Sequence, residues 1–454
     1  MIQKKTVLQG AALLTAAGIA GRIIGFFYRI FLSRTIGAEG VGIYQLIFPL
    51  YALSFSLTVS GIQTAISRFV SAKTAANDQG GARKIFHIGL FFSVGLSLVV
   101  SFILLQFHTL LASNFVKEPR SAGLLRLLAY AIPFGSVHAC INGYYYGLKQ
   151  AKVPAAVEVL EHIVRLGSVV LISRIYAQQG AVITPSIAVY GIIMEELFAA
   201  LISAAALTRY SLSRPPLPAP VHPLSFYVRE MLTLSVPLTL NRVLVNVLQS
   251  IEALMIPLQL RMSGMTASAS LSVYGVLTGM ALPLILFPTA LTSSLCTMLL
   301  PVISEAQATG QLLAIRTALK KICLACLALG GACFLCFFLF GGWLGNLLFH
   351  DALAGSFIRA LFWICPLLYL NPALFAVLNG LGKTAQTFIH NLTGVLIRII
   401  FIVFAIPQFG ISGFFIGMLV NQIIVFLLSM RTILRELKDS HPHPCKTYNK
   451  SNVL

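Results

Sequence analysis

Long apolar runs alternate with short polar segments along nearly the whole chain. Twelve of these runs are long enough for a helix to cross a bilayer, which takes about 20 residues. They lie at 7–32, 41–66, 86–113, 122–147, 154–176, 182–208, 229–257, 270–300, 318–349, 355–379, 386–407 and 411–434. Several contain prolines, which membrane helices tolerate at bends and breaks. The pattern predicts an all-α integral membrane protein with about twelve transmembrane helices.

Composition supports this prediction. The 454 residues are 57% hydrophobic and 10% charged, whereas soluble domains carry about 25% charged residues. The net charge is +19. The Lys and Arg residues of the chain concentrate in the loops predicted on the same side of the membrane as the N-terminus. The positive-inside rule therefore predicts that both termini are cytoplasmic. The same bias accounts for the basic charge without a nucleic-acid partner.

A proline-rich segment divides the chain in the middle. Residues 213–223 read SRPPLPAPVHP, a composition typical of a semi-rigid linker. We expect a six-helix lobe at 1–212, a cytoplasmic linker at 213–228, a second six-helix lobe at 229–436 and a cytoplasmic tail at 437–454.

The two halves also repeat one another. Gly147-Leu148 followed by Arg165 matches Gly380-Leu381 followed by Arg398 at one constant offset. With six spans in each half, both halves have the same orientation, which is a parallel repeat. Substrates of such transporters bind at the interface of the repeats, so we expect a central cavity between the lobes.

Arginines within the predicted spans are the first candidates for a substrate site. Each charged residue at the bilayer centre costs about 2.5–3.5 kcal/mol on insertion scales, so it usually faces a partner or a water-filled cavity. Arg22 and Arg29 share one face of the first span with Gly18 and Gly25. Planar guanidinium groups suit phosphate, although Arg29 could also reach the interface by snorkelling.

The seventh span carries a stripe of polar residues. We expect substrate contacts from Arg242, Asn246, Gln249 and Glu252, which follow Ser235 and Thr239 along the span. The alternative is that the stripe forms hydrogen bonds between helices and only holds the bundle together. Glu252 could instead pair with an arginine, accept a proton or hold a cation.

A third group comprises charges with either a coupling or a structural role. These are Glu158, Glu161, Arg165, Glu195, Glu196 and Arg398. Glu161 and Arg165 have the i, i+4 spacing of a helical ion pair, and the sequence places no acid near Arg398. Proton coupling and structural pairing with Arg165 both remain open for Glu195 and Glu196. His162 and His390 stand alone in their spans.

No catalytic residue or metal site is expected. Cys323, Cys326, Cys333 and Cys336 form two CxxC pairs, a spacing found in zinc sites. They lie within one apolar run, where free cysteine behaves as a small hydrophobic residue.

Four stretches of the chain resemble the stage V sporulation protein B family, a branch of the multidrug/oligosaccharidyl-lipid/polysaccharide exporter superfamily that includes lipid II flippases. They are GRIIGFFYRIFLSRTIGAEGVGIYQLIFPL (21–50), AISRFVSA (65–72), GYYYGLKQAKVPAAVEVLEHIVRL (143–166) and MTASASLSVYGVLTGMALPLILFPTALTSSLCTMLLPVISEA (265–306). The resemblance implies a two-lobed bundle in the bacterial cytoplasmic membrane. It also implies a cavity lined by Arg22, Arg29 and Arg242.

The resemblance further implies a flippase that exports an undecaprenyl-pyrophosphate-linked peptidoglycan precursor or a related glycan, with spore cortex synthesis as one setting. Partners would be that lipid-linked glycan and membrane lipids. No cofactor is expected, and coupling to Na+, H+ or the membrane potential is left open. The alternative is an ion-coupled multidrug or organic-cation antiporter, which needs acids to dominate the cavity. A polyprenyl-phosphate glycosyltransferase is a weaker alternative, because the chain lacks a sizeable acidic loop outside the membrane.

Overall fold

The computed structural model describes residues 2–213 and 221–439, which form helices and connecting turns and no strand. The α-helices are α1 (Ile2–Phe55), α2 (Gly61–Ala75), α3 (Gln79–Leu110), α4 (Ala122–Leu128), α5 (Ala131–Gly147), α6 (Lys152–Gln178), α7 (Ser186–Leu212), α8 (Leu224–Met262), α9 (Ala267–Gly275), α10 (Leu282–Leu286), α11 (Thr289–Ala308), α12 (Leu312–Phe349), α13 (Ala352–Leu361), α14 (Cys365–Gly380), α15 (Thr384–Phe404), α16 (Ile406–Phe409) and α17 (Ile411–Asp439). Short π or 3-10 segments are η1 (Ser56–Ser60), η2 (Leu111–Phe115), η3 (Pro119–Ser121), η4 (Val276–Ala281) and η5 (Phe362–Ile364).

The helices agree with the predicted all-α membrane fold. Within the described ranges, nine helices are long and apolar enough to cross a membrane, or ten if the bent pair α4–α5 counts as one span. One of the nine, Ala12–Ala75, covers the first two predicted spans. Gly37 divides α1 into two arms there, with a φ of 70° that favours glycine. The 27-residue α6 falls outside the count although a predicted span lies within it, because it carries several charges.

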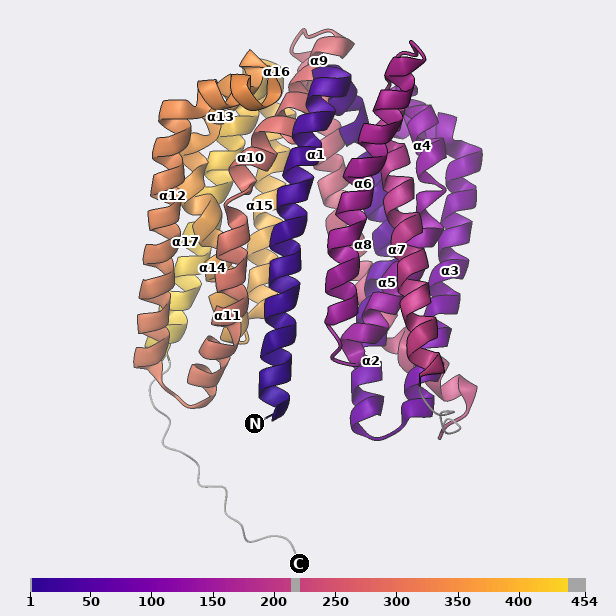
Figure 1. Ribbon diagram of the computed structural model, residues 1–454. Coiled ribbons are helices and arrows are strands. Elements are labelled where there is room, and N and C mark those ends of the chain that lie inside the picture. The colour runs from indigo at the N-terminus through magenta and orange to yellow at the C-terminus, as the bar shows by residue number, and fades with distance from the viewer. Residues whose placement is uncertain (1, 214–220, 440–454) are drawn as a thin grey trace, which may run out of the picture.

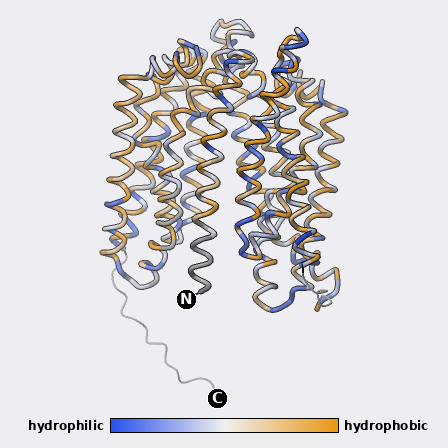
Figure 2. The backbone as a smooth tube through the Cα atoms, in the orientation of Figure 1, coloured by the Kyte–Doolittle hydropathy of each residue, from blue (hydrophilic) through white to orange (hydrophobic). Residues whose placement is uncertain are grey.

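The helices form two lobes (Figure 1). Helices α2 to α7 lie on one side and α10 to α17 on the other, with the first arm of α1 between them. Both described chain ends lie at one end of the bundle, which we call the terminal end; the opposite end is the far end. Figure 2 shows hydrophobic residues along most of each helix and hydrophilic residues gathered toward the two ends.

The expected linker and tail are described only in part. Residues 214–220 of the linker at 213–228 and residues 440–454 of the tail at 437–454 lie outside the described residues. Helix α8 begins at Leu224, within the range expected for the linker. Its first turns join the core of the first lobe, where Tyr227 and Met231 pack with Ile66 and Tyr145.

The sequence repeat reappears as a repeated helix contact. A Cβ atom added to Gly147 would lie 2.7 Å from Val70 Cβ and 2.8 Å from Ser67 O. A Cβ atom added to Gly380 would lie 2.8 Å from Ile303 Cβ and 3.2 Å from Leu300 O. Val70 and Ile303, and likewise Ser67 and Leu300, are separated along the chain by the same offset as the two glycines. The halves therefore share one close approach between their second and fourth helices.

Near the far end, a close crossing of helix backbones at glycine residues joins the lobes. The second arm of α1 meets α9 and η4 where Gly42 lies against Leu271 O, and Gly275 lies against Ala38 O. Gly279 packs on Val41 beside them. No Cβ atom fits at Gly42 or Gly275 unless the backbones separate, so the crossing sets the distance between the lobes.

An ion-pair network lies at the same end. Glu118, between α3 and η3, pairs with Arg120 at 2.7 Å and with Arg261 of α8 at 2.9 Å. Arg120 also pairs with Glu39 of α1 at 2.7 Å. Burial alone would raise the pKa of Glu118, but the hydrogen bonds and charges of Arg120 and Arg261 outweigh it and lower that pKa. The network connects the first lobe with the end of α8.

The glycine crossing leads to a stability prediction. We expect Gly275→Ala to destabilise the fold by about 1–3 kcal/mol, because the new methyl group overpacks the crossing. Gly331→Ala in α12 is the matched control. Its Cβ would meet nothing within 4 Å, so it should be neutral or stabilising by up to about 1 kcal/mol. Thermal unfolding midpoints in detergent measure both, and equal midpoints for the two variants would contradict the tight crossing.

The ion-pair network leads to a pH prediction. Because the folded-state pKa of Glu118 is lowered, the ionised carboxylate stabilises the fold above the unfolded-state pKa of about 4.3. This stabilisation is lost as the pH falls from that value through the lower folded-state pKa. Glu118→Gln should therefore reduce the loss of thermal stability at acidic pH. Glu305→Gln, at an exposed carboxyl on α11, should leave the pH profile unchanged. Parallel profiles for wild type and Glu118→Gln would refute the role of this network.

Candidate functional site

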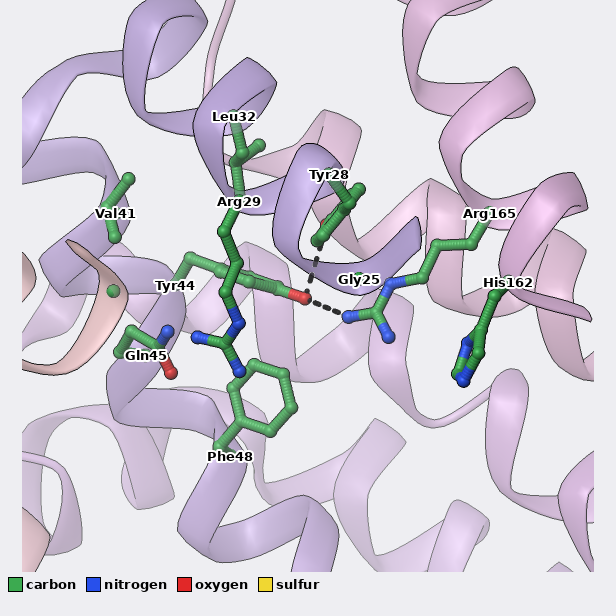
Figure 3. Close-up of a pocket in the computed structure, with 11 residues that line it drawn as sticks. Gly25, Tyr28, Arg29, Leu32, Val41, Tyr44, Gln45, Phe48, His162 and Arg165 are labelled. Atoms are coloured by element: carbon green, nitrogen blue, oxygen red, sulfur yellow. Dashed lines mark hydrogen bonds between the residues drawn. The ribbon is translucent and has the colours of Figure 1, made fainter. Parts of the chain in front are cut away.

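A small polar pocket lies at the interface of the lobes. Its volume is about 160 Å³, well below the roughly 300–1,000 Å³ of pockets that enclose a drug-sized ligand. Both arms of α1, the middle of α6 and η4 of the second lobe provide its lining (Figure 3). The lining residues are Gly25, Tyr28, Arg29, Leu32, Val41, Tyr44, Gln45, Phe48, His162, Arg165 and Gly279. The pocket is large enough for a small charged group but not for an oligosaccharide.

Arg165 is held on three sides. Its Nη2 donates to the Tyr44 hydroxyl at 2.6 Å, and its Nη1 lies 3.1 Å from Glu195 Oε2. Its guanidinium carbon lies 4.6 Å from the centre of the Tyr28 ring, within the range of a cation–π contact. These contacts fix the planar fork at the wall of the pocket.

Arg29 has little compensation for its charge. Its one hydrogen bond to a described residue runs from Nη1 to Thr278 O at 3.5 Å, and no described acid forms an ion pair with it. Figure 3 shows its guanidinium group reaching into the pocket from the side opposite Arg165. The pocket therefore carries excess positive charge at a depth where charge is costly, which makes it receptive to an anion.

Acids and histidines lie behind Arg165. Glu195 is buried, and its Oε1 lies 3.2 Å from His162 Nδ1. Beyond them, His138 lies 3.5 Å from Glu161 and 3.6 Å from Glu196. We call this group the acid–histidine cluster: His138, Glu161, His162, Arg165, Glu195 and Glu196.

Further contacts anchor the cluster. Tyr51 donates to Glu196 Oε1 at 2.6 Å, and Asn142 Nδ2 lies 2.7 Å from His138 Nε2. His138 Nδ1 and Glu196 Oε2 are buried without a hydrogen-bond partner. Glu161, His162 and Glu195 also offer ligand atoms within 4.8 Å of one another, a group that could hold a metal ion.

The structure brings some of the expected residues together. Arg29, Arg165, Glu161, Glu195 and Glu196 lie in the pocket or in the cluster behind it. Of the partners that the sequence left open for Arg165, the ion pair is with Glu195 of α7 and not with Glu161 one turn away. A contact between helices replaces the local pair because α6 and α7 pack side by side.

The other residues expected in the first lobe lie outside the pocket lining. Arg22 is exposed, and its Nη1 donates to Thr289 Oγ1 of α11 at 3.4 Å. It lies two turns from Arg29 on α1, toward the terminal end. Glu158 is partly buried close to Gly18.

The polar stripe of α8 serves several purposes. Thr239 packs against Gly61, and Asn246 donates to Ala52 O at 3.5 Å, so part of the stripe joins helices. Arg242 and Gln249 are exposed. Arg242 forms no hydrogen bond or ion pair with the described residues.

Glu252 is engaged by Arg398, for which the sequence placed no acid nearby. The Arg398 fork donates to both Glu252 oxygens, at 2.6 and 2.9 Å. Asn421 adds a contact: when its amide donates to Gly394 O, its oxygen accepts from Arg398 Nη1 at 3.0 Å. The expected substrate contact from Glu252 therefore competes with a bidentate ion pair.

Several residues of the site escaped the sequence analysis. Tyr28, Tyr44 and Gln45 line the pocket, and His138 and Tyr51 belong to the network behind it. His162 looked isolated because its acid partner lies 33 residues away on another helix. The usable signal was the presence of polar residues in apolar spans, such as His138 and Asn142 one helical turn apart.

Residues 7–307, more than half of the chain, match the model of a family described as polysaccharide biosynthesis protein. The chain belongs to this family. It is 27% identical over 439 residues to stage V sporulation protein B of Bacillus subtilis (strain 168), covering 96% of this chain and 85% of that protein. A shorter region of 168 residues, 35% of this chain and 31% of the relative, is 25% identical to lipid II flippase MurJ of the same organism. The expected family and its flippase branch are confirmed.

Solved structures support the two-lobed fold of this polysaccharide biosynthesis protein. An inward-facing MATE multidrug transporter of the MOP superfamily superposes with a TM-score of 0.66 at 16% identity, over 96% of this chain and 99% of that one. A MOP superfamily transporter from Pyrococcus furiosus gives a TM-score of 0.64 at 16% identity, with 96% of each chain covered. The protein is a multi-pass membrane protein of this family.

The Arg398–Glu252 pair leads to a further prediction. We expect Glu252→Leu to lower stability by about 3–5 kcal/mol, because it leaves the Arg398 charge partly buried and unpaired. The double variant Glu252→Leu/Arg398→Met should recover most of this loss. Thermal unfolding midpoints in detergent measure both effects. A double variant no more stable than Glu252→Leu would contradict the pairing, whereas a stable double variant without transport would show that the pair also serves transport.

Proposed function

We propose that this protein is a flippase that exports an undecaprenyl-pyrophosphate-linked glycan, such as a peptidoglycan precursor, across the bacterial cytoplasmic membrane. The observation that carries the proposal is the pocket at the lobe interface, where Arg29 and Arg165 flank a space with excess positive charge. Similarity to stage V sporulation protein B and to lipid II flippase MurJ supports it. Synthesis of spore cortex is one setting in which such export would serve.

The pyrophosphate is the part of the substrate that fits the pocket. Guanidinium forks form charge-assisted hydrogen bonds with phosphate oxygens and give them a defined orientation. At about 160 Å³ the pocket leaves the glycan outside, in the space between the lobes. The polyprenyl tail stays in the apolar bilayer throughout, so it is not exposed to water during transfer of the head group.

The exposed arginines extend the cationic surface beyond the pocket. Arg22 lies on the face of α1 that leads from the terminal end to Arg29, and Arg242 is exposed on α8. In this proposal they attract the anionic head group on its way to the pocket. With both termini cytoplasmic, the terminal end is the side of entry, and the lobes rock about the pocket to expose it to each side in turn.

The alternative, an antiporter for organic cations, fits the pocket less well. A cation would meet Arg29 and Arg165 at the wall, while the carboxylates lie behind Arg165. The MATE structures share the fold at 16% identity, and a shared fold does not transfer a substrate.

Transport by purified protein tests the proposal. Translocation of fluorescent undecaprenyl-pyrophosphate-linked muropeptide should occur in proteoliposomes with wild type and fall about 10- to 100-fold with Arg29→Ala. This range follows from the loss of a hydrogen bond to a charged group, worth about 1.5–3 kcal/mol. Arg29→Lys should retain part of the activity, since it keeps the charge but not the fork.

Matched variants separate the site from general effects of charge. Arg126→Ala removes an exposed arginine of α4 that lies outside the pocket lining and should leave translocation unchanged. Arg22→Ala and Arg242→Ala should reduce it, which tests the approach path. Full translocation by well-folded Arg29→Ala would overturn the assignment of the pocket.

A further inference from the structure

One guanidinium group belongs to both the pocket and the cluster behind it. Arg165 contacts Tyr44 at the pocket wall through Nη2 and Glu195 through Nη1. An anion in the pocket attracts the same positive charge that compensates Glu195. Each anion bound at Arg165 therefore weakens the compensation of this buried carboxylate.

The cluster has no second cation to replace that compensation. The cluster contains three carboxylates and one guanidinium group: Glu195 pairs with Arg165, whereas Glu161 and Glu196 lie beside His138. Even with Glu161 protonated and both histidines neutral, ionised Glu195 and Glu196 beside Arg165 would give the cluster a net charge of −1 in the membrane interior. Uncompensated charge there is costly, so any further loss of positive charge favours the binding of a cation.

His162 occupies the position where a proton would serve both sides. Its ring lines the pocket, and its Nδ1 lies 3.2 Å from Glu195 Oε1. The other side of the ring packs against Gly21, where a Cβ atom would lie 2.8 Å from Nε2. A protonated ring would compensate Glu195 and face the bound anion at the same time. Imidazole is also the side chain whose ordinary pKa of about 6.5 lies nearest to neutral pH.

We propose that His162 takes up one proton from solvent when a phosphate-bearing anion binds between Arg29 and Arg165. The proton forms one N–H bond on the imidazole ring, and the resulting imidazolium pairs with Glu195 while Arg165 turns its charge toward the anion. Glu195 is then a positioning residue that acts through His162. This inference rests on the proposed anion site and adds the ion that is linked to it.

Other titratable and charged groups surround His162 and Glu195 and affect how readily the imidazole ring takes up a proton. Facing it are Glu158, Glu161 and Arg165 of α6, Glu196 of α7, His138 of α5, and Tyr28, Arg29, Tyr44 and Tyr51 of α1. The carboxylates favour the imidazolium, and the two arginines oppose it. An anion at Arg29 and Arg165 reduces that opposition, which is why uptake accompanies binding.

A proton fits this position better than a metal ion. Glu161, His162 and Glu195 could supply metal ligands, but both oxygens of Glu195 are already engaged, one by His162 and one by Arg165. A metal ion would have to break these contacts and lie next to the guanidinium charge. A proton on His162 needs no rearrangement of Glu195.

Calorimetry measures the linkage directly. The probe is farnesyl-diphospho-N-acetylglucosamine, a diphosphate diester without a group that titrates near neutral pH, added to the purified full-length protein in detergent. Titrations at about pH 7.5 in two buffers of different ionisation enthalpy yield the number of protons taken up. We expect a value approaching one for wild type, and an apparent Kd that weakens by up to about tenfold per pH unit as the pH rises.

Variants assign the proton to His162. His162→Gln should bind the probe with proton uptake near zero, and Glu195→Gln should reduce the uptake because the imidazolium loses its partner. His390→Gln is the matched control, since this intramembrane histidine of the second lobe contacts Ser429 at 3.3 Å, away from the pocket. It should leave proton uptake at the wild-type value.

The outcomes distinguish this inference from the function on which it rests. Binding by wild type with heats independent of the buffer would overturn the proton linkage and leave the anion site intact. Binding that requires Na+ or a divalent ion, without proton uptake, would overturn it in favour of a metal cation in the cluster. Absence of binding by well-folded wild type would overturn the anion site and the linkage together.

Discussion

The ion pair between Arg165 and Glu195 is the contact on which the interior of the first lobe depends. Glu195 lies on α7 and is buried, and Arg165 lies on α6. Without the arginine, Glu195 would be a buried charge beside two further carboxylates. Without the carboxylate, two arginines would face each other across the pocket. The pair allows several ionisable groups to share a small volume of low polarity, which a membrane protein tolerates only when charges compensate each other.

The matching position in the second lobe shows how duplication can separate two roles. Arg398 repeats Arg165 in sequence, but its acid partner comes from α8, and both oxygens of Glu252 accept hydrogen bonds from its fork. Asn421 accepts from its remaining side, so the pair in the second lobe is self-contained. Arg165 keeps a face toward the pocket because Glu195 binds it through one nitrogen. Arg398 thus serves only its own lobe, while Arg165 stabilises its lobe and also borders the pocket.

Hydrophobic runs were sufficient to predict the class of fold, the approximate spans and the repeat, because the bilayer imposes length and polarity on each helix separately. The offset between Gly147 and Gly380 reappeared as a repeated contact, because the close approach that a glycine allows depends on that one position. Partners of charged residues were less predictable. The sequence left Glu161, at the i, i+4 spacing, and Glu195 and Glu196 on the next span open as partners of Arg165, and only the packing of α6 against α7 selected Glu195. His162 and Arg398 looked isolated because helix packing, rather than spacing along one helix, supplied Glu195 and Glu252.

The size of the pocket limits what it can recognise. A space of about 160 Å³ between two guanidinium groups can select for a phosphate-bearing anion, but it cannot read the sugars or peptide attached to it. In the proposed flippase, discrimination between glycans therefore comes from surfaces outside the pocket, along the interface of the lobes. The glycine crossing of α1 with α9 and η4 limits that motion at the far end, because the backbones there are already in contact and can only separate. Recognition of the anion and movement of the lobes thus meet at η4, where Gly279 lines the pocket and packs on Val41 of the crossing. A head group that alters the position of Arg29 or η4 therefore acts directly on the contact that holds the lobes together.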